Sequence, residues 1–321
     1  MTSPEVAAMR AVVCAYGEIG WTSLRTLIEL GVDVPLVVTH EDAPGEQIWF
    51  HSVGDLAREA GIPVIAPEDV NAESSVATVA QTRPDFLFSF YFRNMLKPPL
   101  LALPGRGALN LHGSLLPRYR GRAPVNWVLV EGESETGVTL HYMDERADHG
   151  DVVARQAVTI DRDDCALSLT RKLAAAAETL LRLEIPRLAA GRAARVPQDH
   201  AQATKFGGRR PDDGAIDWQW PAERVRNLVR AVTDPWPGAF TRLRSRKLMI
   251  WWAETGPTGE PRAPGEIQLD ARGVPWVATG DGALALTRVG WEGEPPSEAT
   301  EWARREALRS GERCESKRGT E

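Results

Sequence analysis

AVVCAYGEIG (Ala11–Gly20), followed directly by WTSLRTLIELG (Trp21–Gly31), is the stretch that decides the fold. It opens with an apolar run of strand length and then passes through a glycine-containing turn. The second part carries apolar residues at helical spacing and ends at Gly31, a residue suited to a helix C-terminus. A buried strand that leads into a helix is the unit from which parallel sheets are built, so we expect such a sheet.

The same alternation continues through the first half of the chain. Near-continuous apolar strands between helical segments indicate a mostly parallel α/β sheet that is covered on both faces. AYGEIGW lacks the G-x-G-x-x-G spacing of a dinucleotide site, so we expect no NAD role for it. The expected strands are 34–40, 62–67, 85–91, 107–113, 136–143 and 151–160, and the expected helices are 52–61, 75–84 and 165–191.

The pattern changes at about Lys205. Short apolar runs broken by glycine and proline, and rich in tryptophan, indicate a small β-barrel or sandwich. Residues 221–232 have the pattern of a helix that joins the two parts. We therefore expect an α/β domain over residues 1–203, a β domain over 204–305, and a charged, flexible tail over 306–321.

Composition excludes several functional classes. The 321 residues carry a formal net charge of −6 and a pI of about 5.7, which argues against nucleic acid as a partner. The three cysteines are far apart and match neither a disulfide framework nor a metal site. No run approaches the roughly 18 apolar residues of a membrane span, and no leader peptide is evident. We expect a reduced, soluble, cytoplasmic protein without membrane insertion or a metal; a homo-oligomer is compatible with the sequence.

Asn110 and His112 are the first candidate site residues. They alternate along one expected strand, so both side chains point to the same face. The strand runs into GSLLPRYRGRAP (113–124), whose prolines and glycines we expect to exclude regular structure. Ligands of open α/β sheets collect at such carboxyl ends of strands. The alternative is that Asn110 anchors a turn and that His112 is an ordinary half-buried histidine.

The loop DERADHGD (144–151) supplies candidate partners for His112. A nearby carboxylate fixes the tautomer of a histidine and raises its pKa. From spacing alone the partner could be Asp148, Asp144, Asp151 or His149, and the loop could equally be a solvated surface segment. His141 alternates within its own strand, and we interpret it as structural. We see no zinc-ligand spacing among the histidines and carboxylates.

Arg118, Arg120 and Arg122 follow His112 at spacings of two residues. Guanidinium groups suit bidentate contacts to phosphate or carboxylate, so these arginines could bind an anionic substrate beside His112. They could also be a solvated loop.

The segment LNLHGSLLPRYRGRAPVNWVLVEGESETGVTLHYMDERADHGDVV (Leu109–Val153) strongly resembles the 10-formyltetrahydrofolate-dependent formyltransferases. The resemblance extends through THEDAPGE (39–46), SFYFRNML (89–96), FGGRRPDDGAIDW (206–218) and DPWPGAF (234–240), and so covers roughly residues 10–290. It implies a Rossmann-like formyltransferase domain followed by an OB-like barrel. It also implies direct transfer of a formyl group from 10-formyltetrahydrofolate to an amine.

The resemblance assigns roles to residues. Asn110, His112 and Asp148 match the catalytic triad of the family, and Arg122, with Arg120 beside it, matches the substrate side. The segments that match the two sides of the folate pocket are Asn94, Met95 and Leu96 on one side and Asp144, Glu145, Arg146, Ala147 and Asp148 on the other.

Within the family, the chain looks most similar to the domain that formylates UDP-4-amino-4-deoxy-L-arabinose in bifunctional polymyxin-resistance enzymes, which act in lipid A modification. Those enzymes continue into an NAD-dependent decarboxylase domain, whereas this sequence stops at Glu321. We therefore expect a nucleotide-linked 4-amino sugar as the acceptor, with that sugar or a related one as the first choice. Methionyl-tRNA formyltransferase is the alternative, against which the acidic pI counts.

Overall fold

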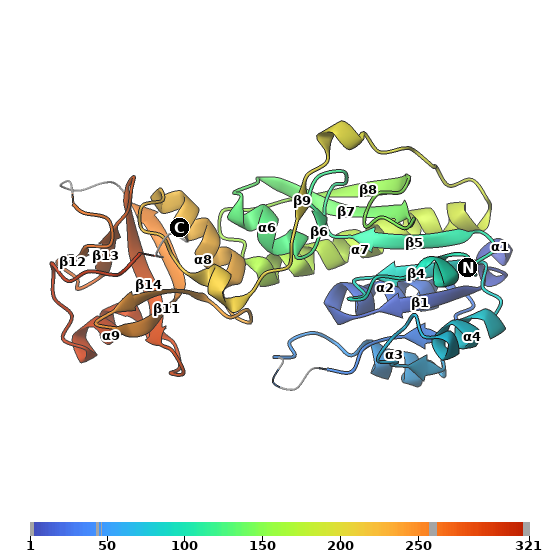
Figure 1. The fold of residues 1–321 in the computed structure, drawn as a ribbon, viewed down its shortest axis with the longest axis horizontal. Helices are drawn as coiled ribbons and strands as arrows, with labels where there is room; N and C mark the ends of the chain where they lie inside the picture. Colours follow the sequence, from blue (N-terminus) through green and yellow to red (C-terminus); the bar gives the residue numbers. More distant parts are fainter. Residues whose placement is uncertain (1–2, 43–44, 46, 257–261, 317–321) are drawn as a thin grey trace. The chain divides into compact units, whose positions relative to one another are not determined.

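The computed structural model describes residues 3–42, 45, 47–256 and 262–316, and Figure 1 shows its elements. Residues 43, 44 and 46 of the THEDAPGE segment and the last five residues of the expected tail lie outside this description. The chain forms two compact units. The first comprises Met1–Pro124, Ser134–Ile160 and Ser168–Gly207, and the second comprises Val125–Glu133, Asp161–Leu167 and Gly208–Glu321.

A seven-stranded sheet is the centre of the first unit. Its order is β3-β2-β1-β4-β5-β7-β8; the first five strands are parallel, and β7 is antiparallel to both of its neighbours, β5 and β8. This confirms the expected mostly parallel α/β sheet. The strands are β1 (Ala11–Ala15), β2 (Val37–Val38), β3 (Val64–Ile65), β4 (Phe86–Phe90), β5 (Gly107–His112), β7 (Glu135–Tyr142) and β8 (Val152–Thr159).

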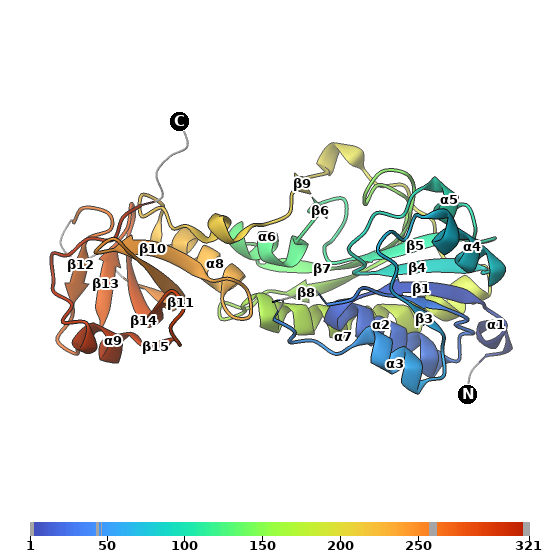
Figure 2. The same cartoon turned by 60° about the horizontal axis from the view of Figure 1, so that its bottom comes forward.

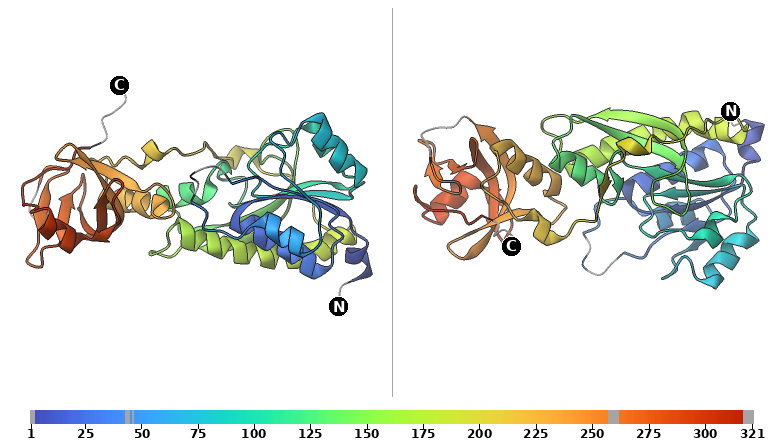
Figure 3. Two further views of the ribbon diagram at one scale, coloured as in Figure 1. Left: turned by 90° about the horizontal axis from the view of Figure 1, so that it is seen from below. Right: turned by 45° about the horizontal axis from the view of Figure 1, so that its top comes forward.

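Helices cover both faces of this sheet, as Figures 2 and 3 show. Helices α2 (Gly17–Leu30), α3 (Val53–Glu59) and α7 (Ala166–Ala189) lie on one face, and α4 (Glu73–Gln81) and α5 (Pro98–Leu101) lie on the other. The short helix α1 (Pro4–Ala7) precedes β1. Helix α2 ends as expected at Gly31, whose φ of 79° is left-handed, but it begins at Gly17 rather than Trp21. Helix α3 begins as expected after Ser52, which accepts a hydrogen bond from Asp55 N–H.

The apolar core beneath α4 and α5 holds the segment that follows β4. Leu96 is buried there together with Leu87 of β4 and Leu100 of α5. Cys14 also belongs to this core, as expected for a small buried hydrophobic residue. The segment 94–97 is thus anchored by Leu96, while Met95 next to it is 54% exposed.

The stretch after β5 contains more regular structure than we expected. Strand β6 (Arg120–Gly121) pairs in parallel with β9 (Lys205–Phe206), and α6 (Pro124–Val130) follows. Gly121 makes the pairing possible, because it has a φ of +103° and a Cβ there would lie 2.1 Å from Phe206 O. The expectation of a wholly irregular stretch was wrong, because a partner strand about 85 residues away provides backbone hydrogen bonds.

The second unit contains a small antiparallel sheet, as expected. Five strands are ordered β10-β11-β14-β13-β12, and β15 pairs with β14. Backbone bridges from Arg242 to Glu315 and from Glu266 to Arg313 connect the C-terminal segment to both edges, which closes the sheet into a barrel. The elements are α8 (Ala222–Val232), β10 (Ala239–Leu243), β11 (Arg246–Gly256), β12 (Ile267–Leu269), β13 (Pro275–Ala278), β14 (Ala283–Trp291), β15 (Ser297–Glu298) and α9 (Ala299–Arg305).

Two segments that precede residue 208 in the sequence also belong to this second unit. Asn126 of α6 donates a hydrogen bond to Ala231 O at 2.7 Å, and Arg226 Nη1 donates one to Arg162 O at 2.9 Å. The boundary near residue 203 that we expected therefore differs from the division observed. The tail also differs, because Leu308 and Cys314 are buried and Cys314 N–H donates to Gly265 O at 2.8 Å.

Candidate functional site

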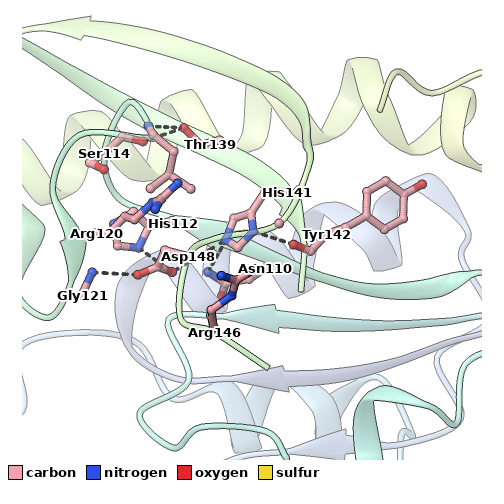
Figure 4. Close-up of polar contacts among 12 residues, drawn as sticks. Asn110, His112, Ser114, Arg120, Gly121, Thr139, His141, Tyr142, Arg146 and Asp148 are labelled. Carbon is pink, nitrogen blue, oxygen red and sulfur yellow. Dashed lines mark hydrogen bonds and ion pairs between the residues drawn. The ribbon is translucent and has the colours of Figure 1, made fainter. Parts of the chain in front are cut away.

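Strand β5 brings Asn110 and His112 to one face of the sheet, at the edge where β1, β4 and β5 all end. Asn110 is half-buried and His112 is buried. The loop 113–123 after β5 and the loop 143–151 after β7 supply the other groups around them. Figure 4 shows the side chains of this cluster. The structure thus brings together the residues that alternate along one strand.

Both ring nitrogens of His112 face oxygen acceptors. Nε2 lies 2.8 Å from Tyr119 O, and Nδ1 lies 3.4 Å from Asp148 Oδ1. The Nε2–H group therefore donates to a backbone carbonyl, which leaves Nδ1 as the nitrogen where a proton can be exchanged. A doubly protonated ring satisfies both contacts, since each acceptor then receives an N–H.

Asp148 reaches His112 because the loop after β7 folds back over the sheet. Asp148 has a left-handed backbone (φ 56°), and its Oδ2 accepts a hydrogen bond from Gly121 N–H at 2.7 Å. Figure 4 shows its carboxylate between the rings of His112 and His141. Burial alone would raise the pKa of Asp148, but the charge of His112 and the hydrogen bond from Gly121 N–H hold that pKa below its usual range. Asp148 is therefore a carboxylate at neutral pH.

The other polar residues of this loop have different partners. Asp144 lies 2.9 Å from His149 Nδ1 and accepts from Arg146 N–H at 2.7 Å, so it shapes the loop. Asp151 pairs with Arg195 at 2.9 Å. Of the partners left open by the sequence, Asp148 is the one that faces His112.

His141 is a site residue that the sequence did not indicate. Its Nδ1 lies 2.8 Å from Tyr142 O, and its Nε2 lies 3.1 Å from Asn110 Nδ2. Because Nδ1–H donates to the carbonyl, Nε2 of the neutral ring is an acceptor, and it receives one N–H of Asn110. The second N–H of the Asn110 amide is then available to a ligand. The pairing of Asn110 with His141 across β5 and β7 produces this contact.

The expected anion-binding role of Arg120 is not supported by its position. Arg120 is 9% exposed, and its Nη2 donates to Gln198 Oε1 at 2.6 Å and lies 2.9 Å from His200 Nδ1. Its guanidinium is thus used inside the protein. Arg118 and Arg122 are exposed, and Arg122 Nη2 lies 3.3 Å from Arg93 O.

The segment 94–97 presents unused backbone groups. Asn71 Nδ2 donates to Met95 O at 3.0 Å, and Asn71 Oδ1 accepts from Lys97 N–H at 2.8 Å. Among the described residues, no hydrogen bond uses the N–H or C=O of Leu96 between them. Since its side chain is buried in the core, Leu96 is fixed in place with a free backbone donor and acceptor.

Two of the three cysteines, Cys14 and Cys314, are buried. Burial raises the pKa of the Cys14 and Cys314 thiols to about 12, which disfavours the thiolate that a nucleophile requires. The described residues contain no group of three or more His, Cys, Asp or Glu side chains that could hold a metal ion. None of their helices is long and apolar enough to span a membrane.

Comparison with protein families identifies the family of the chain. The chain matches the family described as formyl transferase over residues 23–185, just over half of its length, and the formyl transferase C-terminal domain over residues 209–307. The chain belongs to the formyl transferase family. It is therefore a formyltransferase, as the resemblance implied.

Solved structures with the same fold include other formyltransferases. WlaRD, a sugar 3N-formyl transferase solved in the presence of dTDP and 5-N-formyl-THF, matches with a TM-score of 0.67 and 18% identity over 89% of this chain and 99% of that chain. The N-formyltransferase from Helicobacter canadensis in complex with folinic acid and dTDP-3-aminofucose matches with a TM-score of 0.68 and 18% identity over 87% of this chain and 98% of that chain. HypX from Aquifex aeolicus in complex with tetrahydrofolic acid matches with a TM-score of 0.61 and 17% identity over 92% of this chain and 47% of that chain. At these identities the similarity establishes the fold.

Proposed function

We propose that this formyltransferase transfers the formyl group of 10-formyltetrahydrofolate to the amine of a nucleotide-linked amino sugar. The observation that carries the proposal is the convergence of Asn110, His112 and Asp148 at the carboxyl edge of the sheet, with a hydrogen-bond donor beside a charged pair. Two of the similar structures are described with a folate compound together with dTDP or a dTDP-linked amino sugar, which supports this class of ligands.

The residues around the cluster fit a folate. The pterin ring carries donors and acceptors along one edge, and the free N–H and C=O of Leu96 are complementary to such an edge. Asn94, Met95 and Leu96 would form one side of the pocket, and the loop from Asp144 to Ala147 would form the other. The bound folate supplies an activated formyl group.

Asn110 would stabilise the charge that develops on the formyl oxygen. His141 orients its amide so that a second N–H faces outward from the contact at 3.1 Å. A preorganised donor of this kind costs no reorganisation during the reaction, and removing one typically costs about 3 kcal/mol of transition-state stabilisation.

His112 and Asp148 would act as one proton-transfer unit. The attacking amine must lose a proton, and the departing nitrogen must gain one. Nδ1 of His112 and Oδ1 of Asp148 are the groups that hold the exchangeable proton, since Nε2–H is bound to Tyr119 O. When both ring nitrogens carry a proton, Nδ1–H faces the carboxylate of Asp148, and the positive charge of the ring would also stabilise an oxyanion. No covalent formyl-enzyme is required.

Arg122 would contact the acceptor. The exposed Arg122 suits an anionic group such as the diphosphate of a nucleotide sugar. UDP-4-amino-4-deoxy-L-arabinose remains our first candidate, and dTDP-linked amino sugars are the alternatives that the similar structures suggest. Charged initiator tRNA is the competing acceptor.

Tetrahydrofolate release tests the proposal. The enzyme is incubated with 10-formyltetrahydrofolate and, separately, with UDP-linked amino sugars, dTDP-linked amino sugars or methionyl initiator tRNA. We expect stimulation by a nucleotide-linked amino sugar and none with the same sugar acetylated on its nitrogen. Stimulation by the tRNA alone would show that the acceptor class is wrong.

A further inference from the structure

The segment 195–206 contacts both loops that carry the site. Val196 exchanges two backbone hydrogen bonds with Val152, at 2.8 and 2.9 Å, directly after the end of the loop 143–151. Further along, Thr204 O accepts from Arg120 N–H at 2.9 Å, and Phe206 O accepts from Arg122 N–H at 3.1 Å, in the loop after β5. One short stretch of chain therefore holds both loops.

Gln198 is the buried side chain in this segment, at 5% exposure. Its Nε2 donates to Asp148 O at 3.0 Å and to Gly150 O at 2.7 Å. Its Oε1 accepts from Arg120 Nη2 at 2.6 Å. The amide orientation follows from the partners, since carbonyls can only accept and a guanidinium can only donate.

These contacts act on the groups that hold the proton-transfer pair. The two carbonyls flank His149, and the first of them belongs to Asp148, whose left-handed backbone is uncommon for a residue other than glycine. At the other end, Arg120 precedes Gly121, whose N–H holds Asp148 Oδ2 at 2.7 Å. Gln198 thus connects the backbone of Asp148 to the strand that positions its carboxylate.

We propose that Gln198 is a positioning residue that fixes the carboxylate of Asp148 against His112. The expected effect on kcat rests on the proposed function, whereas the expected effect on the position of the Asp148 carboxylate does not. The proposed role requires the amide of Gln198, because its two N–H groups donate to the carbonyls of Asp148 and Gly150 while its oxygen accepts from Arg120.

Glutamate at this position is the informative replacement. It has nearly the same size as glutamine and can still accept from Arg120, but it has no N–H to donate. One of its oxygens would face the carbonyls of Asp148 and Gly150, so the loop would shift. A displacement of about 1 Å at a catalytic group can cost about 100-fold in rate, and we expect a 10- to 100-fold loss of kcat.

The test compares Q198E and Q198A with the wild type, each also in the D148N background. Q202E is the matched control, because Gln202 lies in the same segment but is exposed. Formyl transfer is measured well below the melting temperature, with KM for both substrates. The amide proton of Gly121 is followed by NMR, because its shift reports the hydrogen bond to Asp148 whether or not the enzyme turns over.

We expect Q198E to lower kcat 10- to 100-fold and to change KM less than about 3-fold. In the D148N background the same substitution should lower kcat less than about 3-fold. Q198E should also move the Gly121 amide signal upfield. Q202E should change none of these. Equal losses in both backgrounds, or an unchanged Gly121 signal in both Q198E and Q198A, would overturn the inference. A wild type that transfers formyl to no acceptor, while the Gly121 signal still moves, would contradict the proposed function and not the positioning role.

Discussion

Replacement of Asp148 by asparagine separates charge from geometry at the site. Asparagine has nearly the same shape, so its Oδ1 can still accept from Gly121 N–H, now 2.7 Å from Asp148 Oδ2. Its Nδ2 would then face Nδ1 of His112, which lies 3.4 Å from Oδ1 of Asp148. That contact is satisfied when Nδ1 carries no proton, so D148N would hold His112 in place as a neutral ring.

The expected loss of rate is large because D148N removes the negative charge that faces Nδ1 of His112. Asparagine in place of the aspartate that orients a catalytic histidine lowers kcat by about 10⁴-fold in the serine proteases, where the tautomer is changed. Here Nε2–H remains bound to Tyr119 O, so the tautomer is kept, and we expect a loss of about 10³-fold from charge and proton transfer.

The expected loss of stability is small at neutral pH and depends on pH. A hydrogen bond to a charged group contributes about 1.5–3 kcal/mol and a neutral one about 1 kcal/mol, so D148N should cost about 1–2 kcal/mol. Because folding lowers the pKa of Asp148, its carboxylate stabilises the folded state in full above the ordinary value of about 3.9, and this contribution is lost as the pH falls below that value. The free energies of unfolding of the wild type and D148N should therefore become more similar as the pH falls.

Two assays check these values. Tetrahydrofolate release under saturating substrates gives kcat, and thermal melting between pH 3 and pH 8 gives the stability difference, about 2–4 °C per kcal/mol for a domain of this size. D55N is a suitable control, since Asp55 pairs with Arg58 at the surface. A D148N enzyme with more than a tenth of the wild-type kcat, or a melting difference that grows in acid, would refute the reasoning.

Three further predictions concern the proposed oxyanion donor, the histidine that orients it and the proposed folate segment. N110A should lower kcat about 10²–10³-fold with little change in melting temperature, and a smaller loss of kcat in the release assay would exclude the oxyanion role. H141Q should retain a higher kcat than H141N. The glutamine amide can reach the position of His141 Nε2, which lies 3.1 Å from Asn110 Nδ2, whereas the asparagine amide reaches only the position of Nδ1. Equal kcat values for the two variants would count against the orienting contact. N71A should raise KM for 10-formyltetrahydrofolate about 5- to 20-fold with kcat nearly unchanged, because it releases the backbone on both sides of Leu96, and an unchanged KM would place the folate elsewhere.

Local patterns were sufficient to predict the sheet and one strand of the site. Alternation within β5 correctly placed Asn110 and His112 on one face, because a strand has a fixed period of two. The long apolar runs of β1 and β4 correctly indicated a parallel sheet that is buried on both faces. These features depend only on residues near one another in the sequence.

The features that the sequence did not indicate depend on contacts between distant residues. His141 enters the site through the register of β5 with β7, and an irregularity in the pairing of β7 with β8 lies at the same position. Arg120 is buried because Gln198, 78 residues away, accepts its hydrogen bond. The choice of Asp148 over Asp144 came from the resemblance, since both lie in one acidic loop and only the folded loop shows which of them faces His112.

The most direct test of the account follows the formyl carbon itself. The enzyme is given 10-formyltetrahydrofolate labelled in the formyl group, together with a panel of UDP- and dTDP-linked amino sugars, and the products are analysed by mass spectrometry. We predict that the label appears as an N-formyl group on one of these sugars with one tetrahydrofolate released per label, and that H112A abolishes both products. Label recovered only as free formate, or transfer that persists in H112A, would contradict the account.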